Sequence, residues 1–135
     1  MYNISIFDSY QQKILVPYGG IDYNEKVILY GAGVNGINIY RYLNENSKCK
    51  IVNWVDKLFD SINLADIGIN YEVNSPDSID IRGTEKIIIT ALKLDAVQNI
   101  KKHLLNRGIS TDRILWIKDE YIERPEKLLN GIQNI

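Results

Sequence analysis

Short apolar runs and helical periodicities alternate along this chain of 135 residues from Lys26 onward. The apolar runs are nearly continuous, which is typical of parallel strands buried on both faces of a sheet. They predict strands at 26–30, 51–55, 69–73, 86–90 and 113–117. Strands that alternate with helical segments in this way indicate an α/β domain built on a parallel sheet.

Helices are predicted where apolar residues recur every three or four positions, from Val34 to about Asn46 and from about Leu94 to Asn106. Gly108 supplies a left-handed cap for the second of these helices. Ser75-Pro76-Asp77 has the pattern of a helix start, with proline at the first helical position. A last short helix is expected at about 126–132.

Right-handed crossovers between these elements give a doubly wound, Rossmann-like sheet of about five strands in the order 3-2-1-4-5. The predicted domain spans 26–118, residues 1–25 form an extension that packs on it, and 119–135 form a helical tail. In this topology a ligand crevice lies outside the carboxyl ends of the strands 26–30 and 86–90, where the strand order reverses.

Three glycines follow the first strand at the spacing G-x-G-x-x-G. Gly31 permits a tight turn, Gly33 leaves room for a pyrophosphate against the backbone, and Gly36 lets the helix pack closely on the sheet. The helix that begins at Val34 presents unpaired N–H groups and its positive dipole end to the same anion. Asp56, twenty residues after Gly36, ends the second strand and is suited to accept hydrogen bonds from ribose hydroxyls. This combination is the signature of a dinucleotide-binding unit.

An acid at position 56 would also repel a 2′-phosphate, which favours NAD over NADP, although Lys57 directly after it weakens this preference. Thr90 and Ala91 reach the crevice from the strand 86–90. The predicted ligand contacts are Gly31, Ala32, Gly33, Val34, Asn35, Gly36, Asp56, Lys57, Thr90 and Ala91. In the alternative interpretation, the glycines serve packing alone and Asp56 is a solvated strand-end carboxylate or a helix cap.

The charge balance argues against several classes of partner. Sixteen basic and seventeen acidic residues give a formal charge of −1, so we expect no nucleic-acid or anionic-membrane binding. No stretch approaches the roughly 20 apolar residues that span a bilayer. Residues 1–10 lack the pattern of a signal peptide and Cys49 has no second cysteine to pair with, so a cytoplasmic location is expected.

The residues needed for common enzyme mechanisms are missing. His103 is the only histidine and Cys49 the only cysteine, so neither a zinc site nor a Cys–His pair is expected. None of the nine tyrosines is followed by lysine four residues later, the spacing of the proton relay in short-chain dehydrogenases. The tail 119–135 offers little chain with which to enclose a substrate. We therefore expect a binding site without catalytic residues.

Several segments carry a resemblance to a known family: V-I-L-Y-G-A-G-V-N-G at 27–36, I-V-N-W-V-D-K at 51–57, S-P-D-S-I at 75–79, I-I-I-T-A at 87–91 and R-G-I-S-T-D-R-I at 107–114. Together they make the chain resemble the small Rossmann-like domains of bacterial surface-polysaccharide and sugar-nucleotide proteins. Such domains stand alone or are fused to glycosyltransferases, methyltransferases and nucleotide-sugar epimerases. The resemblance implies a module for NAD or a nucleotide-sugar, with contacts at Gly31, Gly33, Val34, Asn35, Gly36 and Asp56.

Three hypotheses follow. The first is a cytoplasmic module that binds NAD(H) or a nucleotide-sugar and works beside polysaccharide-biosynthesis enzymes without complete chemistry of its own. The second is a subunit of a sugar-nucleotide oxidoreductase or epimerase that another chain completes. The third is a scaffold or interaction domain whose pocket holds no ligand. An exposed sheet edge also allows a homodimer.

Overall fold

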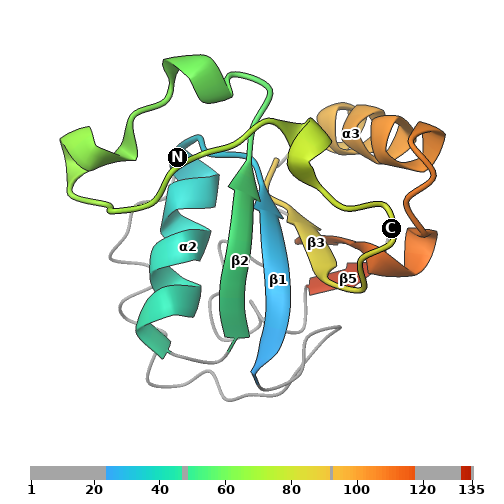
Figure 1. The fold of residues 1–135 in the computed structure, drawn as a ribbon, viewed down its shortest axis with the longest axis horizontal. Helices are drawn as coiled ribbons and strands as arrows, with labels where there is room; N and C mark the ends of the chain where they lie inside the picture. The colour runs from blue at the N-terminus through green and yellow to red at the C-terminus, as the bar shows by residue number, and fades with distance from the viewer. Residues whose placement is uncertain (1–23, 47–48, 92, 118–131, 135) are drawn as a thin grey trace.

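The computed structural model describes residues 24–46, 49–91, 93–117 and 132–134. Its centre is a five-stranded sheet in the order β2-β1-β3-β4-β5 (Figure 1). The first four of these strands are parallel, and β5 is antiparallel to β4. The strands are β1 (Glu25–Tyr30), β2 (Cys49–Val55), β3 (Lys86–Ile89), β4 (Ile114–Ile117) and β5 (Ile132–Asn134). The protein therefore belongs to the α/β class.

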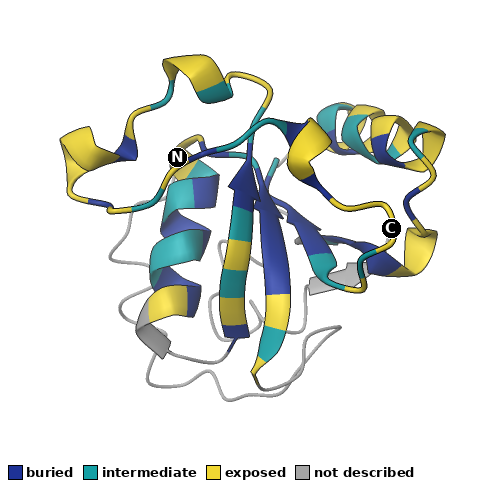
Figure 2. Ribbon diagram, viewed as in Figure 1, coloured by how far each residue is buried: buried dark blue, intermediate teal, exposed yellow. Residues whose placement is uncertain are grey.

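Within the described residues, two α-helices form where they were predicted, α2 at Val34–Asn46 and α3 at Leu94–Asn106. They cover opposite faces of the sheet, and the strand residues between them are the most deeply buried part of the chain (Figures 1 and 2). On the α2 face the core includes Ile39, Leu43, Leu29 and Trp54, and on the α3 face Val97, Leu104, Ile28 and Ile89. Gly108 follows α3 in the left-handed conformation, with φ +95°, as predicted.

One predicted strand is wrong. Among the described residues, 69–73 form no strand. The segment that follows them pairs with β2 only through a single parallel bridge between Val55 and Asn74. The N–H of Asn74 donates to the carbonyl of Trp54 at 2.8 Å, and the N–H of Asp56 donates to the carbonyl of Asn74 at 3.2 Å. The four predicted strands that do form stand in the predicted order without this third member.

Side chains occupy the backbone groups of β2 that a third strand would use. Oδ1 of Asn53 accepts from the N–H of Trp54 at 2.9 Å and from the side-chain amide of Asn74 at 3.0 Å. The hydroxyl of Tyr71 donates to the carbonyl of Ile51 at 3.2 Å. Because buried backbone groups need a partner but not a particular one, these side chains remove the requirement for further strand pairing.

The predicted helix at 126–132 is also wrong at its end, because Ile132 begins β5. β4 would otherwise present an unpaired edge, and the short strand β5 supplies its hydrogen-bond partners. The rest of this predicted helix and the extension up to residue 23 lie outside the described residues. Within the described part of the chain, no helix has both the length and the apolar character needed to cross a membrane.

The connection from β2 to β3 contains three 3₁₀ turns in place of a long helix: η1 (Phe59–Ser61), η2 (Leu64–Ile67) and η3 (Pro76–Ser78). The predicted helix start at 75–77 is confirmed as the start of η3, since Oγ of Ser75 accepts from the N–H of Asp77 and Pro76 occupies the first helical position. Short turns of this kind leave many carbonyl groups unpaired within the segment.

Two arginines satisfy those carbonyls. Arg113 ends the short turn η4 (Thr111–Arg113) and is 5% exposed. Its guanidinium donates to the carbonyls of Asp80 and Glu85, both at 2.8 Å, and lies 3.5 Å from the Glu85 carboxylate. Arg107 donates to the carbonyls of Pro76, Asp77 and Ile79 at 3.0–3.2 Å. The planar guanidinium suits this task because it offers five N–H donors.

Replacing Arg113 with methionine should therefore destabilise the protein. The substitution keeps the apolar stem but leaves buried carbonyls without donors, so the free energy of unfolding should fall by about 3 kcal/mol. Urea denaturation measures this loss. Arg82→Met in the same connection is the control, because Arg82 is exposed and its replacement should change stability by less than about 0.5 kcal/mol. Equal effects of the two substitutions would contradict this role of Arg113.

Cys49 should be chemically inert in the folded protein. Burial, and to a lesser degree the Glu25 carboxylate, raises the pKa of its thiol to about 11. Since the thiolate is the nucleophile, Ellman's reagent at about pH 8 should modify the urea-unfolded protein much faster than the folded one. The unfolded thiol ionises near pH 8.5, so stability should fall as the pH rises from there towards 11. Rapid modification of the folded protein would show that the thiol is accessible.

Candidate functional site

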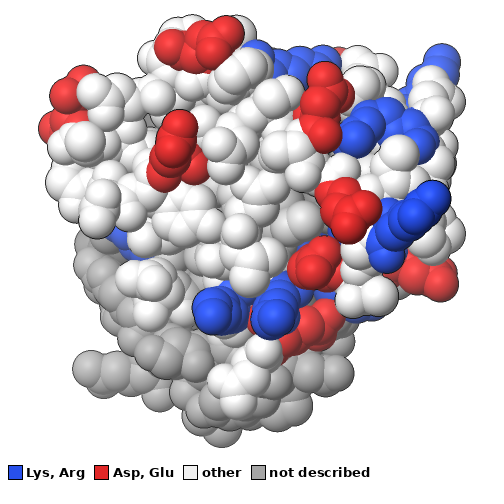
Figure 3. Space-filling model, viewed as in Figure 1, with Lys and Arg blue, Asp and Glu red and all other residues white. Residues whose placement is uncertain are grey.

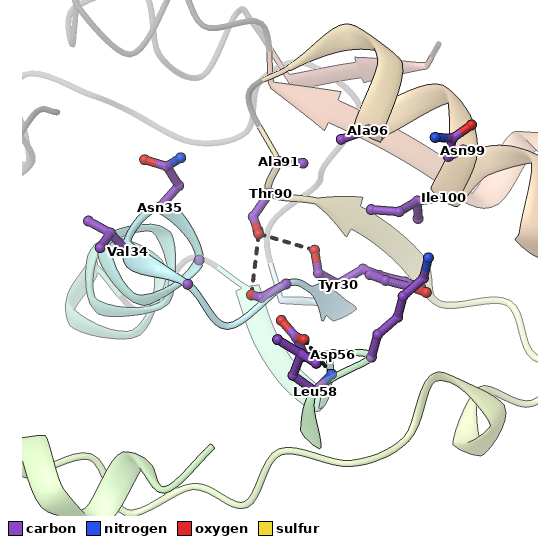
Figure 4. Close-up of a pocket in the computed structure, with 14 residues that line it drawn as sticks. Tyr30, Val34, Asn35, Asp56, Leu58, Thr90, Ala91, Ala96, Asn99 and Ile100 are labelled. Atoms are coloured by element: carbon purple, nitrogen blue, oxygen red, sulfur yellow. Dashed lines mark hydrogen bonds between the residues drawn. The ribbon is translucent and has the colours of Figure 1, made fainter. Parts of the chain in front are cut away.

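A cavity of about 570 Å³ opens at the carboxyl ends of β1 and β3, beside the first turns of α2 and α3. β1 lies between β2 and β3, so the strand order reverses at this point. Nine of the ten predicted contact residues line the cavity, all but Ala32. Figure 4 shows Val34 and Asn35 on the α2 side, Asn99 and Ile100 on the α3 side, and Thr90 between them. A crevice in this position is where open α/β sheets usually bind ligands.

The glycine turn, residues 31–36, is held by two residues of β2 and by Thr90, which directly follows β3. The N–H of Gly31 donates to the carbonyl of Val55 at 2.7 Å. The carbonyl of Gly31 accepts from the indole N–H of Trp54 at 2.8 Å and faces the Thr90 hydroxyl at 3.2 Å. The same hydroxyl lies 3.1 Å from the carbonyl of Tyr30 (Figure 4). Thr90 and Trp54 therefore fix the turn, and the Thr90 hydroxyl is directed at the backbone of the turn.

Asp56 binds the same turn through its carboxylate. One oxygen accepts from the N–H of Ala32 at 2.8 Å, and the other accepts from the N–H of Leu58 at 2.8 Å. This arrangement matches the alternative interpretation, in which Asp56 caps backbone groups. It does not exclude a ligand, because each carboxylate oxygen has a second lone pair. Asp56 also lines the cavity, so its remaining lone pairs are suited to a hydroxyl group of a bound molecule.

Packing requires two of the three glycines of this turn but not the third. Gly31 has φ +121°, and a side chain there would collide with Oγ1 of Thr90. A Cβ at Gly36 would collide with the carbonyl of Gly31, so the close packing of α2 on the turn requires this glycine. Gly33 differs, because a Cβ there would meet no atom of the described residues within 4 Å and its φ lies outside the left-handed region. Packing explains Gly31 and Gly36 but does not explain Gly33.

Gly33 lies directly before α2, at the position of the N-cap, and has no side chain with which to cap the helix. The N–H of Ile37 donates to the carbonyl of Gly33 at 2.9 Å, so the N–H groups of residues 34–36 precede the helical ladder. The first turn of α2 contains no acidic residue. Elsewhere in the described chain, side-chain oxygens of Asn63, Ser75 and Ser110 cap short helices, and α3 has Asp95 in its first turn. Among the described residues, neither an N-cap side chain nor an acid in its own first turn thus compensates the positive end of α2 where it meets the cavity.

Five cavity residues were not predicted from the sequence: Tyr30, Leu58, Ala96, Asn99 and Ile100. Three of them belong to one face of α3, at the spacing i, i+3 and i+4. The sequence could have predicted these three residues, because the helix after β3 begins at the same end of the sheet as the glycine turn. Tyr30 ends β1 and is 2% exposed, so in the sequence it resembles any other buried strand residue.

No family model matches this chain. No curated protein and no solved structure is significantly similar to it either. Among the described residues, no three His, Cys, Asp or Glu side chains are grouped so that they could hold a metal ion. Acidic and basic side chains are interspersed on the face drawn in Figure 3. The function of the cavity must therefore be inferred from its own geometry.

Measurements of the free energy of unfolding can test the different roles of Gly33 and Gly36. Gly36→Ala should lower the free energy of unfolding by about 1–3 kcal/mol, because its methyl group meets the backbone of the turn. Gly33→Ala should change it by less than about 0.5 kcal/mol, since a weaker helix cap is offset by a less flexible unfolded chain. Thermal and urea denaturation of both variants measure the difference. A large loss for Gly33→Ala would mean that the fold itself requires this glycine.

Proposed function

We propose that this protein is a Rossmann-like module that binds NAD(H) or a nucleotide-sugar through its phosphate groups. The observation that carries the proposal is Gly33. No packing contact with a described residue requires a glycine there, yet the missing side chain keeps the cavity open directly before the N-terminus of α2. Backbone N–H groups at an uncapped helix N-terminus form a natural anion site. A phosphate against Gly33 would receive hydrogen bonds from the N–H groups of residues 34–36.

The rest of the cavity suits a nucleotide. Its volume of about 570 Å³ lies within the usual range of small-molecule sites, roughly 300–1,000 Å³. Asp56 would accept a hydrogen bond from a ribose hydroxyl while it holds the turn, and Lys57 adds a cation at the edge of the site. The acid favours NAD over NADP, since a 2′-phosphate would lie against the carboxylate. The turn is already fixed, so binding requires little rearrangement of the backbone.

We propose binding without an independent reaction. Of the described residues that line the cavity, only Tyr30, Asp56 and Lys57 have ionisable side chains, and both oxygens of Asp56 already accept backbone hydrogen bonds. The resemblance to domains of surface-polysaccharide proteins supports a role in the cytoplasm beside the enzymes of that metabolism. A catalytic partner chain would then supply the groups that act on the bound molecule.

Isothermal titration calorimetry with NAD, NADP, UDP-glucose and pyrophosphate tests the proposal. We expect the unmodified protein to bind NAD or UDP-glucose. Gly33→Asp should weaken binding at least about 10-fold, because a carboxylate then occupies the phosphate position and caps α2. The same cap should leave the melting temperature unchanged or raise it, which separates loss of binding from loss of folding.

Thr84→Asp is the matched control, since it adds the same charge on an exposed residue just before β3, at the amino end of the strand. Its affinity should equal that of the unmodified protein. If the unmodified protein binds none of these ligands at millimolar concentration, the proposed function is wrong and the domain is better described as a scaffold.

A further inference from the structure

Tyr30 carries a buried hydroxyl group that no described residue satisfies. The side chain is 2% exposed and lines the cavity, and its hydroxyl has no hydrogen-bond partner. In Figure 4 it extends from the end of β1 beneath Ile100, away from Val34 and Asn35. Buried hydroxyls in native proteins are nearly always paired, because an unpaired one loses its hydrogen bonds to water without replacement. An orphaned hydroxyl at the wall of a cavity indicates a partner that is absent.

We propose that the α3 end of the cavity binds a neutral polar group of the ligand, a sugar or a base, with the Tyr30 hydroxyl as its hydrogen-bond donor. This inference rests on the proposed function, because it takes the phosphates to lie at the opposite end, against Gly33. Asn99 on α3 lines the same cavity and offers an amide that both donates and accepts. The site therefore has two ends of different chemistry.

The electrostatic surroundings of Tyr30 favour a neutral partner over an anionic one. Burial raises the pKa of the phenol most, the carboxylates of Asp56 and Asp77 raise it further, and Arg107 opposes them. The hydroxyl thus keeps its proton at neutral pH and acts as a donor. Asp56 also holds the glycine turn, so the Asp77 carboxylate is the one that would repel a phosphate specifically at this end. The N-terminus of α2 would attract a phosphate at the other end, so a phosphorylated sugar or nucleoside would have one preferred orientation.

A ligand reaches the Tyr30 hydroxyl only after a side chain moves, because the oxygen itself is not exposed. Lys57 and Asn99 also line the cavity, and both are exposed. Long exposed side chains change rotamer without disturbing the core, so such a movement leaves the sheet intact. Under this proposal, binding of the neutral group requires only a local side-chain adjustment at this end of the cavity.

Tyr30→Phe tests the inference. It removes only the orphaned hydroxyl, so the melting temperature of the ligand-free protein should stay the same or rise. Affinity for NAD or UDP-glucose should fall roughly 3- to 10-fold, the contribution of one hydrogen bond. Affinity for pyrophosphate, which has no sugar or base, should not change. Calorimetry with the three ligands measures all of these values.

Tyr71→Phe is the control, because it removes a hydroxyl that lies outside the cavity and bonds to the carbonyl of Ile51. It should leave all three affinities unchanged. If the unmodified protein binds NAD or UDP-glucose and Tyr30→Phe binds it equally well, this inference is wrong while the proposed function stands. If the unmodified protein binds none of the ligands, both are wrong. An equal loss of pyrophosphate affinity would also overturn the inference, because it would assign Tyr30 to the phosphate end.

Discussion

The fixed backbone of Gly31 is the constraint on which the rest of the site depends. Its N–H is bound by the carbonyl of Val55, and its carbonyl by the indole of Trp54 and the hydroxyl of Thr90. These partners come from β2 and from the residue that directly follows β3, so the turn is fixed by the sheet as a whole. This fixed turn sets where α2 begins, and its backbone leaves no room for a side chain at Gly36.

This fixed turn would keep the proposed anion site in place before a ligand binds. Asp56 joins the end of β2 to Ala32, so the backbone before α2 cannot relax into the cavity. The N–H groups at the start of α2 then stay available, because Gly33 brings no side chain that would cap them. Sites whose donors are fixed before the ligand arrives lose less conformational entropy on binding. The structural role of Asp56 and its proposed role towards a ribose are therefore compatible.

The apolar runs and helical periods predicted α2, α3 and four strands of the sheet, since burial on two faces dictates those patterns. The third strand could not be predicted, because the side chains of Asn53 and Tyr71 replace its backbone pairing and such contacts leave no periodic signal. Most of the cavity followed from the glycine spacing and the strand ends. The unpaired hydroxyl of Tyr30 and the hydrogen bond of the Trp54 indole could not be predicted. The sequence of a buried strand does not show which of its polar side-chain atoms form hydrogen bonds.

The most direct measurement of the central claim is a two-dimensional ¹H–¹⁵N NMR titration of the protein with NAD and with UDP-glucose. The account predicts that the largest shifts fall on the amides of Gly33 and of Val34, Asn35 and Gly36, which precede the helical ladder of α2. The amides of the strand cores should move little, because the turn is already held in place. Shifts confined to other parts of the chain, with these four amides unchanged, would contradict it.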